Sequence, residues 1–272
     1  MQMKSDTFNI APLLDDGTWS RYQKFVLMMA AMTIIFDGMD IQALGFAIPS
    51  MMKEFSAPRA VFATIAAVSL IGMSIGTMIA GALGDRLGRK PVLIGCVLFF
   101  GMLTAGTALA NDVTTLGVMR FLAGLGLGGA LPNAITLSAE YTPAKHRALG
   151  VVLTIVCITF GGMLGGIIAA EVLPTPGWRA LFLIAGLIPV AVGALLIFIF
   201  PESPRYLVHQ PHRHGELAAI LSRIGHHFAV GTKFGALTEK VERHRRLGSL
   251  FASGYLRYTL LLWAGFFFYV AT

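Results

Sequence analysis

Long apolar stretches separated by short polar ones make up most of the first 200 residues of the chain. A helix needs about 20 consecutive, mostly apolar residues to cross the hydrocarbon core of a bilayer. A seventh apolar run, 258–272, has 15 residues and is shorter than a full span. Six earlier stretches are long enough and predict membrane-spanning helices over 25–52, 60–84, 91–111, 113–139, 148–170 and 180–200. The predicted fold class is therefore all-α membrane, with six complete transmembrane helices and a partial seventh.

The polar segments between these runs predict the domain organisation. We expect an N-terminal tail over 1–24, a six-helix bundle over 25–200, a polar loop over 201–257 and an incomplete helix over 258–272. Within the polar loop, the stretch "ELAAILSRIG" carries apolar residues at helical spacing. It predicts a short amphipathic helix that lies on the membrane or against the bundle. The apolar positions are Leu217, Ile220, Leu221 and Ile224.

The distribution of Lys and Arg predicts how the helices are oriented, because these residues favour cytoplasmic loops. With the N-terminus placed in the cytoplasm, seventeen of the 21 lie on the cytoplasmic side. Only Lys53, Arg59 and Arg179 lie outside, and Arg120 lies within a span. We therefore expect a multi-pass protein of a bacterial-type inner membrane, with a cytoplasmic N-terminus.

Composition narrows the function classes. The chain is 56% hydrophobic and 13% charged, with a mean hydropathy of +0.72, which is typical of a polytopic membrane protein. The net charge of +7 is explained by the orientation signal and by anionic lipid, so we expect a lipid bilayer and no nucleic acid as partner. Cys96 and Cys157 lie in apolar runs, and the seven histidines show no metal-ligand spacing. We expect no metal, no cofactor and, because no nucleophile–base set occurs, no enzyme and no catalytic residue.

Two acids interrupt the first apolar run, in "TIIFDGMDIQALGF". Asp37 and Asp40 are three residues apart, so both project from one face of a helix. A charge at mid-bilayer costs at least about 2.5–3.5 kcal/mol. This face must therefore line an aqueous cavity or meet a cation inside the bundle, and a substrate or proton site is the functional interpretation. The structural alternative is a buried pair that caps a helix break at Gly38.

The fourth apolar run adds three further candidates. Arg120 is the only cation within the six predicted spans, and it either neutralises an aspartate or holds a carboxylate substrate. The alternative is an arginine that snorkels to the outer interface. Asn133 follows Pro132, which predicts a kink and a polar group facing the cavity. Glu140, at the inner end, is either a cytoplasmic gate residue or a surface acid.

The stretch "GALGDRLGRKP", 81–91, is the most specific motif. It resembles the signature G-x-L-x-D-R-x-G-R-[RK] of the major facilitator superfamily. Two further stretches are similar to other patterns of that superfamily: "RFLAGLGLGG", which starts at Arg120, and "PESPRYL", which starts at Pro201. "DGMD", from Asp37 to Asp40, resembles the D-G-x-D signature of its aromatic acid:proton symporter family. The resemblance implies the N-terminal half of a twelve-helix fold, followed by the start of helix 7.

This resemblance implies roles for individual residues. Asp37 and Asp40 would serve proton-coupled uptake of an aromatic carboxylate, such as a hydroxybenzoate, protocatechuate, gallate or vanillate, by alternating access. Arg120 and Glu140 would support binding or coupling. The motif would form a cytoplasmic gate latch whose expected partners belong to the second half of the fold. Its residues are Gly81, Asp85, Arg86, Gly88, Arg89 and Lys90.

Two other functions stay open at this point. "PESPRYL" is shared with sugar porters, so a sugar or other organic-anion facilitator is one alternative. The chain covers about the first 60% of a typical family member, so the other is a truncated half-transporter without activity of its own. Such a half would pair with a second copy of itself or with a separate C-terminal half.

Overall fold

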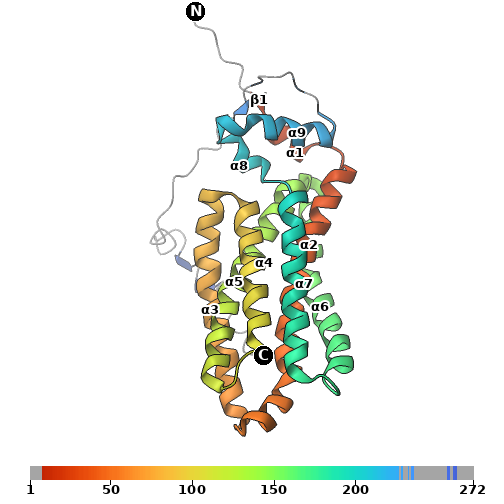
Figure 1. Cartoon of the computed structure of the whole chain (residues 1–272). Coiled ribbons are helices and arrows are strands. Elements are labelled where there is room, and N and C mark those ends of the chain that lie inside the picture. The colour runs from red at the N-terminus through yellow and green to blue at the C-terminus, as the bar shows by residue number, and fades with distance from the viewer. Residues whose placement is uncertain are drawn as a thin grey trace, which may run out of the picture. The chain divides into compact units, whose positions relative to one another are not determined.

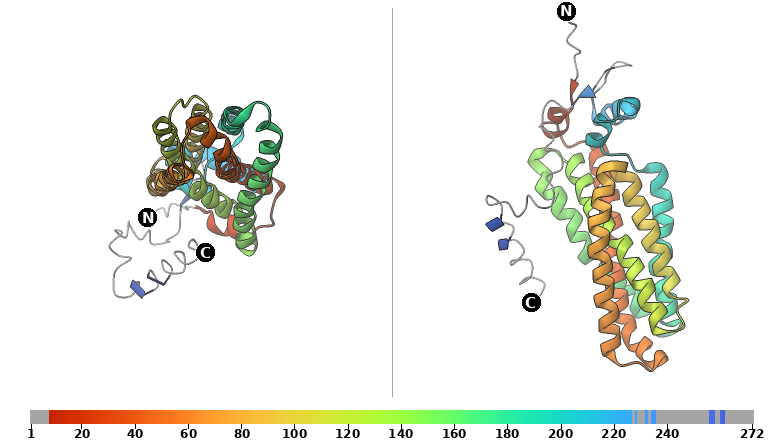
Figure 2. Two further views of the ribbon diagram at one scale, coloured as in Figure 1. Left: turned by 90° about the horizontal axis from the view of Figure 1, so that it is seen from below. Right: turned by 90° about the vertical axis from the view of Figure 1, so that its left-hand side faces the viewer.

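The computed structural model of the chain describes residues 8–226, 228, 232, 234–235, 256–257 and 260–261. Six long helices run side by side in it (Figures 1 and 2). Each lies within a few residues of a predicted span, and within the described residues these six are long and apolar enough to cross a membrane. The predicted spans are therefore confirmed. The helices are α2 (Arg21–Phe55), α3 (Arg59–Leu87), α4 (Arg89–Thr107), α5 (Val113–Tyr141), α6 (Arg147–Val172) and α7 (Gly177–Ile199).

Local sequence signals set several helix ends. A capping box starts α2, where the Ser20 side chain accepts from the N–H of Gln23 and the Gln23 side chain accepts from the N–H of Ser20. Asp112 caps α5 by accepting from the N–H of Thr115 at 2.8 Å. Gly88 ends α3 and starts α4 at a φ of 104°, a conformation that favours glycine.

Glycines let α3 pack closely on α5, and α2 on α6. A Cβ added to Gly128 of α5 would lie 1.9 Å from the carbonyl oxygen of Met73 in α3. A Cβ on Gly38 of α2 would lie 1.8 Å from the carbonyl oxygen of Ile158 in α6, and Gly161 meets the α2 backbone in the same way. Gly38 therefore serves helix packing. The alternative of a helix break at this residue is wrong, because α2 continues through it.

Short elements close one end of the bundle, here called the capped end (Figure 1). They are α1 (Ala11–Asp15), η1 (Ala144–His146), α8 (Pro204–Val208), η2 (Pro211–Arg213), α9 (His214–Ile224) and the parallel pair β1 (Phe8–Asn9) and β2 (Phe234–Gly235). Leu14, Leu207, Leu217 and Leu221 are buried in one cluster with bundle residues. The predicted amphipathic helix is thus confirmed as α9, and it lies against the bundle.

The chain divides into two compact units, Met1–Gly235 and Ala236–Thr272. All the elements above belong to the first unit. In the second, residues 256–257 and 260–261 are described and are helical. The apolar run 258–272 lies largely outside the described residues, so the incomplete seventh helix stays a prediction.

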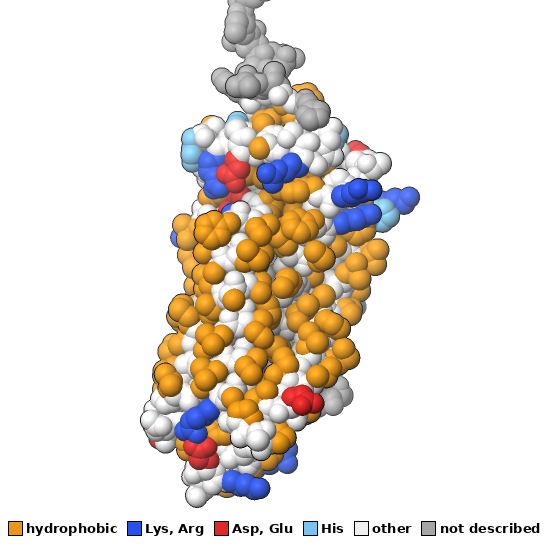
Figure 3. All heavy atoms as spheres, turned by 45° about the vertical axis from the view of Figure 1, so that its right-hand side comes forward, with side chains coloured by type: hydrophobic (Ala, Val, Ile, Leu, Met, Phe, Trp, Pro, Cys, Tyr) orange, Lys and Arg blue, Asp and Glu red, His pale blue; other side chains and the backbone are white. Residues whose placement is uncertain are grey.

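The surface of the bundle is apolar along its length. On the face shown in Figure 3, hydrophobic side chains cover the middle of the helices, and Lys, Arg, Asp and Glu lie near the two ends. Met78, Leu109 and Phe198 are among the large apolar side chains that stay exposed. Such a surface is stable in lipid, where exposed apolar groups need no burial in protein.

Candidate functional site

A buried ion pair joins α2 to α5. Arg120 Nη1 lies 2.9 Å from Asp40 Oδ1 and 3.1 Å from Asp40 Oδ2. The side chains of Arg120 and Asp40 are 1% and 7% exposed. The interpretation of Arg120 as a snorkelling side chain is therefore wrong, because the guanidinium stays inside the bundle and meets a carboxylate. The sequence left two possibilities for the acidic face, an aqueous cavity or a cation inside the bundle. Asp40 meets a cation.

Helix α4 completes the environment of the guanidinium. Arg120 Nη2 donates to the hydroxyl of Thr104 at 3.0 Å and to that of Thr107 at 2.9 Å. The ring of Phe182, from α7, lies 4.9 Å from the guanidinium carbon. Both terminal nitrogens of the guanidinium thus have partners, whereas Nε has none among the described residues.

Asp37 lies close by but is differently placed. Its side chain is buried, with 2% of the residue exposed, and Oδ1 has no hydrogen-bond partner within the described part of the chain. The two acids predicted to act together are therefore distinct. Asp40 is neutralised by Arg120, whereas Asp37 has no cation beside it among the described residues.

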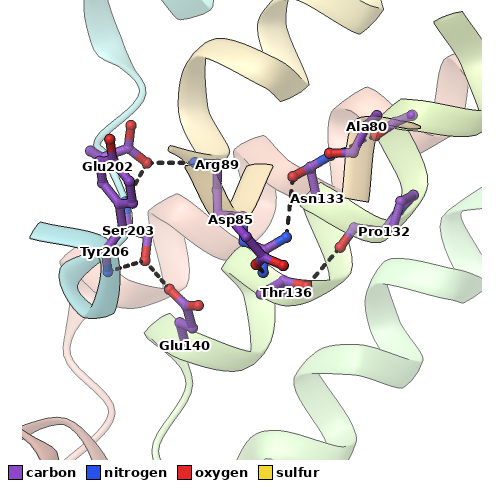
Figure 4. A network of polar contacts seen from close by, with 11 residues as sticks. Ala80, Asp85, Arg89, Pro132, Asn133, Thr136, Glu140, Glu202, Ser203 and Tyr206 are labelled. Carbon is purple, nitrogen blue, oxygen red and sulfur yellow. Dashed lines mark hydrogen bonds and ion pairs between the residues drawn. The ribbon is translucent and has the colours of Figure 1, made fainter. Parts of the chain in front are cut away.

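A second polar network lies at the capped end and includes Asp85 and Arg89 of the 81–91 motif (Figure 4). Glu202 Oε1 accepts from the backbone N–H of Arg89 at 2.9 Å, of Lys90 at 3.0 Å and of Ser203 at 2.8 Å. It therefore satisfies donors in the first turn of α4, where a carboxylate also interacts favourably with the helix dipole. A Cβ on Gly88 would lie 2.4 Å from the other carboxylate oxygen, so glycine is required here for space as well.

The Arg89 side chain extends this network into α3 and α5. Its Nη2 pairs with Asp85, one turn earlier, and its Nη1 lies 3.4 Å from Asn133 Oδ1. The amide of Asn133 donates to the carbonyls of Gly129 at 2.8 Å and Ala80 at 3.3 Å. Asn133 is fully buried between helices, so the prediction that it faces a cavity is wrong.

Glu140 also belongs to the capped end. Its carboxylate accepts a hydrogen bond from the hydroxyl of Ser203 (Figure 4). Asn133 is thirteen residues from Arg120 along α5, or about 20 Å of helix. The structure therefore separates the candidates into two groups, Asp37, Asp40 and Arg120 inside the bundle, and Asn133, Glu140 and the motif at the capped end.

Gly81 and the side chains of Arg86 and Lys90 contribute less to the network. The carbonyl of Arg86 accepts from the Tyr206 hydroxyl at 3.3 Å. Lys90 lines a cavity of about 430 Å³ together with Glu202 and Arg213. A Cβ on Gly81 would meet no described atom within 4 Å, so packing inside this part of the chain does not require glycine there.

Sequence reasoning missed four polar residues that complete these two groups. Thr104 and Thr107 are spaced by three in an apolar run, which places both on one helix face and is a detectable signal. Glu202 and Ser203 lie inside "PESPRYL", which was used only as a family pattern. Their roles depend on long-range contacts that no local pattern specifies.

Comparison with known proteins adds independent information. The family model for the Major Facilitator Superfamily matches residues 30–272. The chain is 36% identical over 255 residues to a gallate transporter from Pseudomonas putida, covering 93% of this chain and 57% of that protein. It is 36% identical over 259 residues to the 4-hydroxybenzoate transporter PcaK from Acinetobacter baylyi, covering 94% and 57%. The chain thus spans a little over half the length of these curated relatives.

A solved structure of the proton:xylose symporter XylE is similar in fold. The TM-score is 0.67 at 25% sequence identity, and the likeness covers 76% of this chain and 50% of that one. The helices that hold the buried ion pair and the capped-end network thus share their arrangement with a transporter of known structure. Because the family model extends over most of the sequence, the chain belongs to the Major Facilitator Superfamily.

Proposed function

We propose that the chain forms the N-terminal bundle of a proton-coupled transporter that imports an aromatic carboxylate by alternating access. The observation that carries this proposal is the buried pair of Asp40 and Arg120 with the buried Asp37 beside it, whose Oδ1 has no hydrogen-bond partner among the described residues. Ionisable groups inside a membrane bundle mark substrate or proton pathways. The gallate and 4-hydroxybenzoate transporters among the relatives support an aromatic acid as the substrate class.

The two acids have different roles in this mechanism. A carboxylate without a cation inside the bundle is costly, so a proton is the group that neutralises Asp37. Asp40 keeps Arg120 neutralised while no substrate is bound. When a proton adds to Asp40, Arg120 loses its counter-charge, and the carboxylate of an incoming aromatic acid can supply it. Deprotonation of Asp40 restores the ion pair and releases the substrate anion.

The capped end is proposed to face the cytoplasm, since it carries ten of the fifteen Lys and Arg residues that the structure describes. A polar network there joins α3, α4 and α5 to the segment after α7. It consists of the motif residues Asp85 and Arg89 together with Glu202, Asn133 and Glu140. Because these contacts cross between elements, their breakage and re-formation would accompany gating. A second bundle is proposed to complete the substrate path.

One observation favours a second candidate. The fold likeness to XylE, together with "PESPRYL", supports a sugar as substrate. The Asp40–Arg120 pair favours an anion instead, because a neutral sugar supplies no counter-charge. Competition between unlabelled sugars and unlabelled aromatic acids for uptake of a labelled aromatic acid distinguishes the two.

Uptake of labelled 4-hydroxybenzoate into cells that express the gene for this chain tests the proposal. We expect uptake that rises with an inward proton gradient and is lost in Asp37→Asn combined with Asp40→Asn. The matched control is Glu171→Gln, which removes an exposed carboxylate of α6 and should leave uptake unchanged. Uptake that survives the double substitution contradicts the mechanism. Cells that take up no aromatic acid support the half-transporter alternative.

A further inference from the structure

Thr104 contacts both members of the buried ion pair. Its hydroxyl donates to Asp40 Oδ1 at 3.1 Å and accepts from Arg120 Nη2 at 3.0 Å. Thr104 is 0% exposed and Arg120 is 1% exposed, so the contact is buried. We propose that Thr104 is a positioning residue that holds Asp40 as a carboxylate against Arg120, through a hydrogen bond that weakens when Asp40 takes up a proton. The inference rests on the proposed function for its link to transport, although the contact itself does not.

The Thr104 hydroxyl group has a single hydrogen to donate. Because Arg120 Nη2 donates to the Thr104 oxygen, the Thr104 hydrogen is directed away from the guanidinium and toward Asp40. It therefore needs an acceptor on Oδ1. That oxygen accepts the hydrogen bond about twice as strongly when Asp40 is ionised as when the carboxyl group carries a proton. The hydrogen bond of Thr104 thus depends on the charge state of Asp40.

Thr107 provides a natural comparison on the same helix. Its hydroxyl accepts from the same nitrogen of Arg120, at 2.9 Å. Its own hydrogen, however, points to the backbone carbonyl of Leu103 at 2.9 Å and not to Asp40. Thr107 therefore holds Arg120 in place whatever the charge of Asp40. Both threonines contact the cation, and only Thr104 contacts the acid.

Few other groups act on this contact. Among the described residues, the charged groups at the pair are Arg120 from α5 and Asp37 from α2 itself. Helix α4 contributes the two hydroxyls, and α7 contributes the uncharged ring of Phe182. Thr104 is thus the neutral donor that stabilises the ionised form of Asp40, since hydrogen bonds to a charged acceptor are about twice as strong as neutral ones.

Infrared difference spectroscopy of the purified chain in detergent tests the contact without requiring transport. The carboxylate band of Asp40 is assigned by its loss in Asp40→Asn. We expect Thr104→Val to shift this band, Thr104→Ser to restore it and Thr107→Val to leave it in place. A band that is the same in Thr104→Val and wild type overturns the inference, as does an equal shift in Thr107→Val.

Transport assays then test the link to coupling. In Thr104→Val we expect proton-driven uptake of 4-hydroxybenzoate to fall by about tenfold, the factor expected for losing a hydrogen bond to a charged group. Exchange of internal for external substrate, which needs no net proton movement, should be retained. An equal loss of both activities at unchanged protein level indicates a merely structural role and overturns the proposal. A wild type without any uptake supports the half-transporter alternative and leaves the infrared result to decide the contact.

Discussion

The Asp40–Arg120 pair makes a quantitative prediction about stability. Asp40→Asn keeps the shape of the side chain but removes the counter-charge of a guanidinium that is 1% exposed. Removing one partner of a buried pair costs about 3–5 kcal/mol. An unpaired charge at the centre of a span costs about 2.5–3.5 kcal/mol on insertion scales. We therefore expect Asp40→Asn to lower the free energy of unfolding by about 3 kcal/mol.

Arg120→Met should cost less at mildly acidic pH than Asp40→Asn. The remaining carboxylate can be neutralised by a proton, whereas arginine cannot be deprotonated in proteins. Combining the two substitutions removes both charges at once. The double variant should therefore be about 2–3 kcal/mol more stable than the sum of the two single losses.

Unfolding by sodium dodecyl sulfate in mixed micelles, followed by tryptophan fluorescence, measures these differences. Trp19 and Trp178 lie at opposite ends of the bundle and report on it from both sides. Asp37→Asn is the matched control, because it removes a carboxylate with no cation partner in the described structure. It should change stability far less than Asp40→Asn. Strictly additive losses in the double variant would refute the ion pair as a coupled unit.

Three further variants test other parts of the fold. Gly128→Leu places a side chain against the α3 backbone and should destabilise the bundle or prevent its folding. Gly81→Leu meets no described atom within 4 Å of its Cβ and should be tolerated. Thermal unfolding in detergent measures both effects. Glu202→Ala leaves three backbone donors without an acceptor and should lower the free energy of unfolding by about 1–3 kcal/mol. Glu202→Gln keeps an acceptor oxygen and should lower it by a smaller amount, as the same micelle assay will measure. Hydrogen bonds from Thr115 hold the pKa of Asp112 below its usual value. The cap therefore contributes to the free energy of unfolding at pH values above the unfolded-state pKa, and this contribution is lost as pH falls through the folded-state pKa. The stability difference between Asp112→Ala and wild type should accordingly be present at neutral pH and vanish in strong acid.

The sequence was sufficient to predict the six spans and the superfamily. Apolar length sets a transmembrane helix, and local caps such as Ser20 fix where α2 begins, so these features need no tertiary information. The 81–91 motif likewise lies in one turn. The small-residue faces around Gly128 and Gly161 were also predictable, because helices in lipid approach through such residues.

The partners of the polar residues were less predictable. Asp37 and Asp40 look equivalent in sequence, yet only Asp40 reaches Arg120, because the packing of α2 on α5 decides which acid meets the cation. Asn133 was placed with the substrate site and lies instead beside Arg89. Its distance of about 20 Å from Arg120 along α5 follows from the sequence separation, but its contact with Arg89 depends on how α3, α4 and α5 pack.

Accumulation of labelled 4-hydroxybenzoate under an imposed pH gradient tests the central claim most directly. The measurement uses membrane vesicles that contain the product of this gene, with and without a protonophore. The mechanism predicts accumulation above the external concentration, collapse with the protonophore, and no accumulation in the variant that combines Asp37→Asn and Asp40→Asn. Accumulation that persists in that variant, or that ignores the proton gradient, would contradict it.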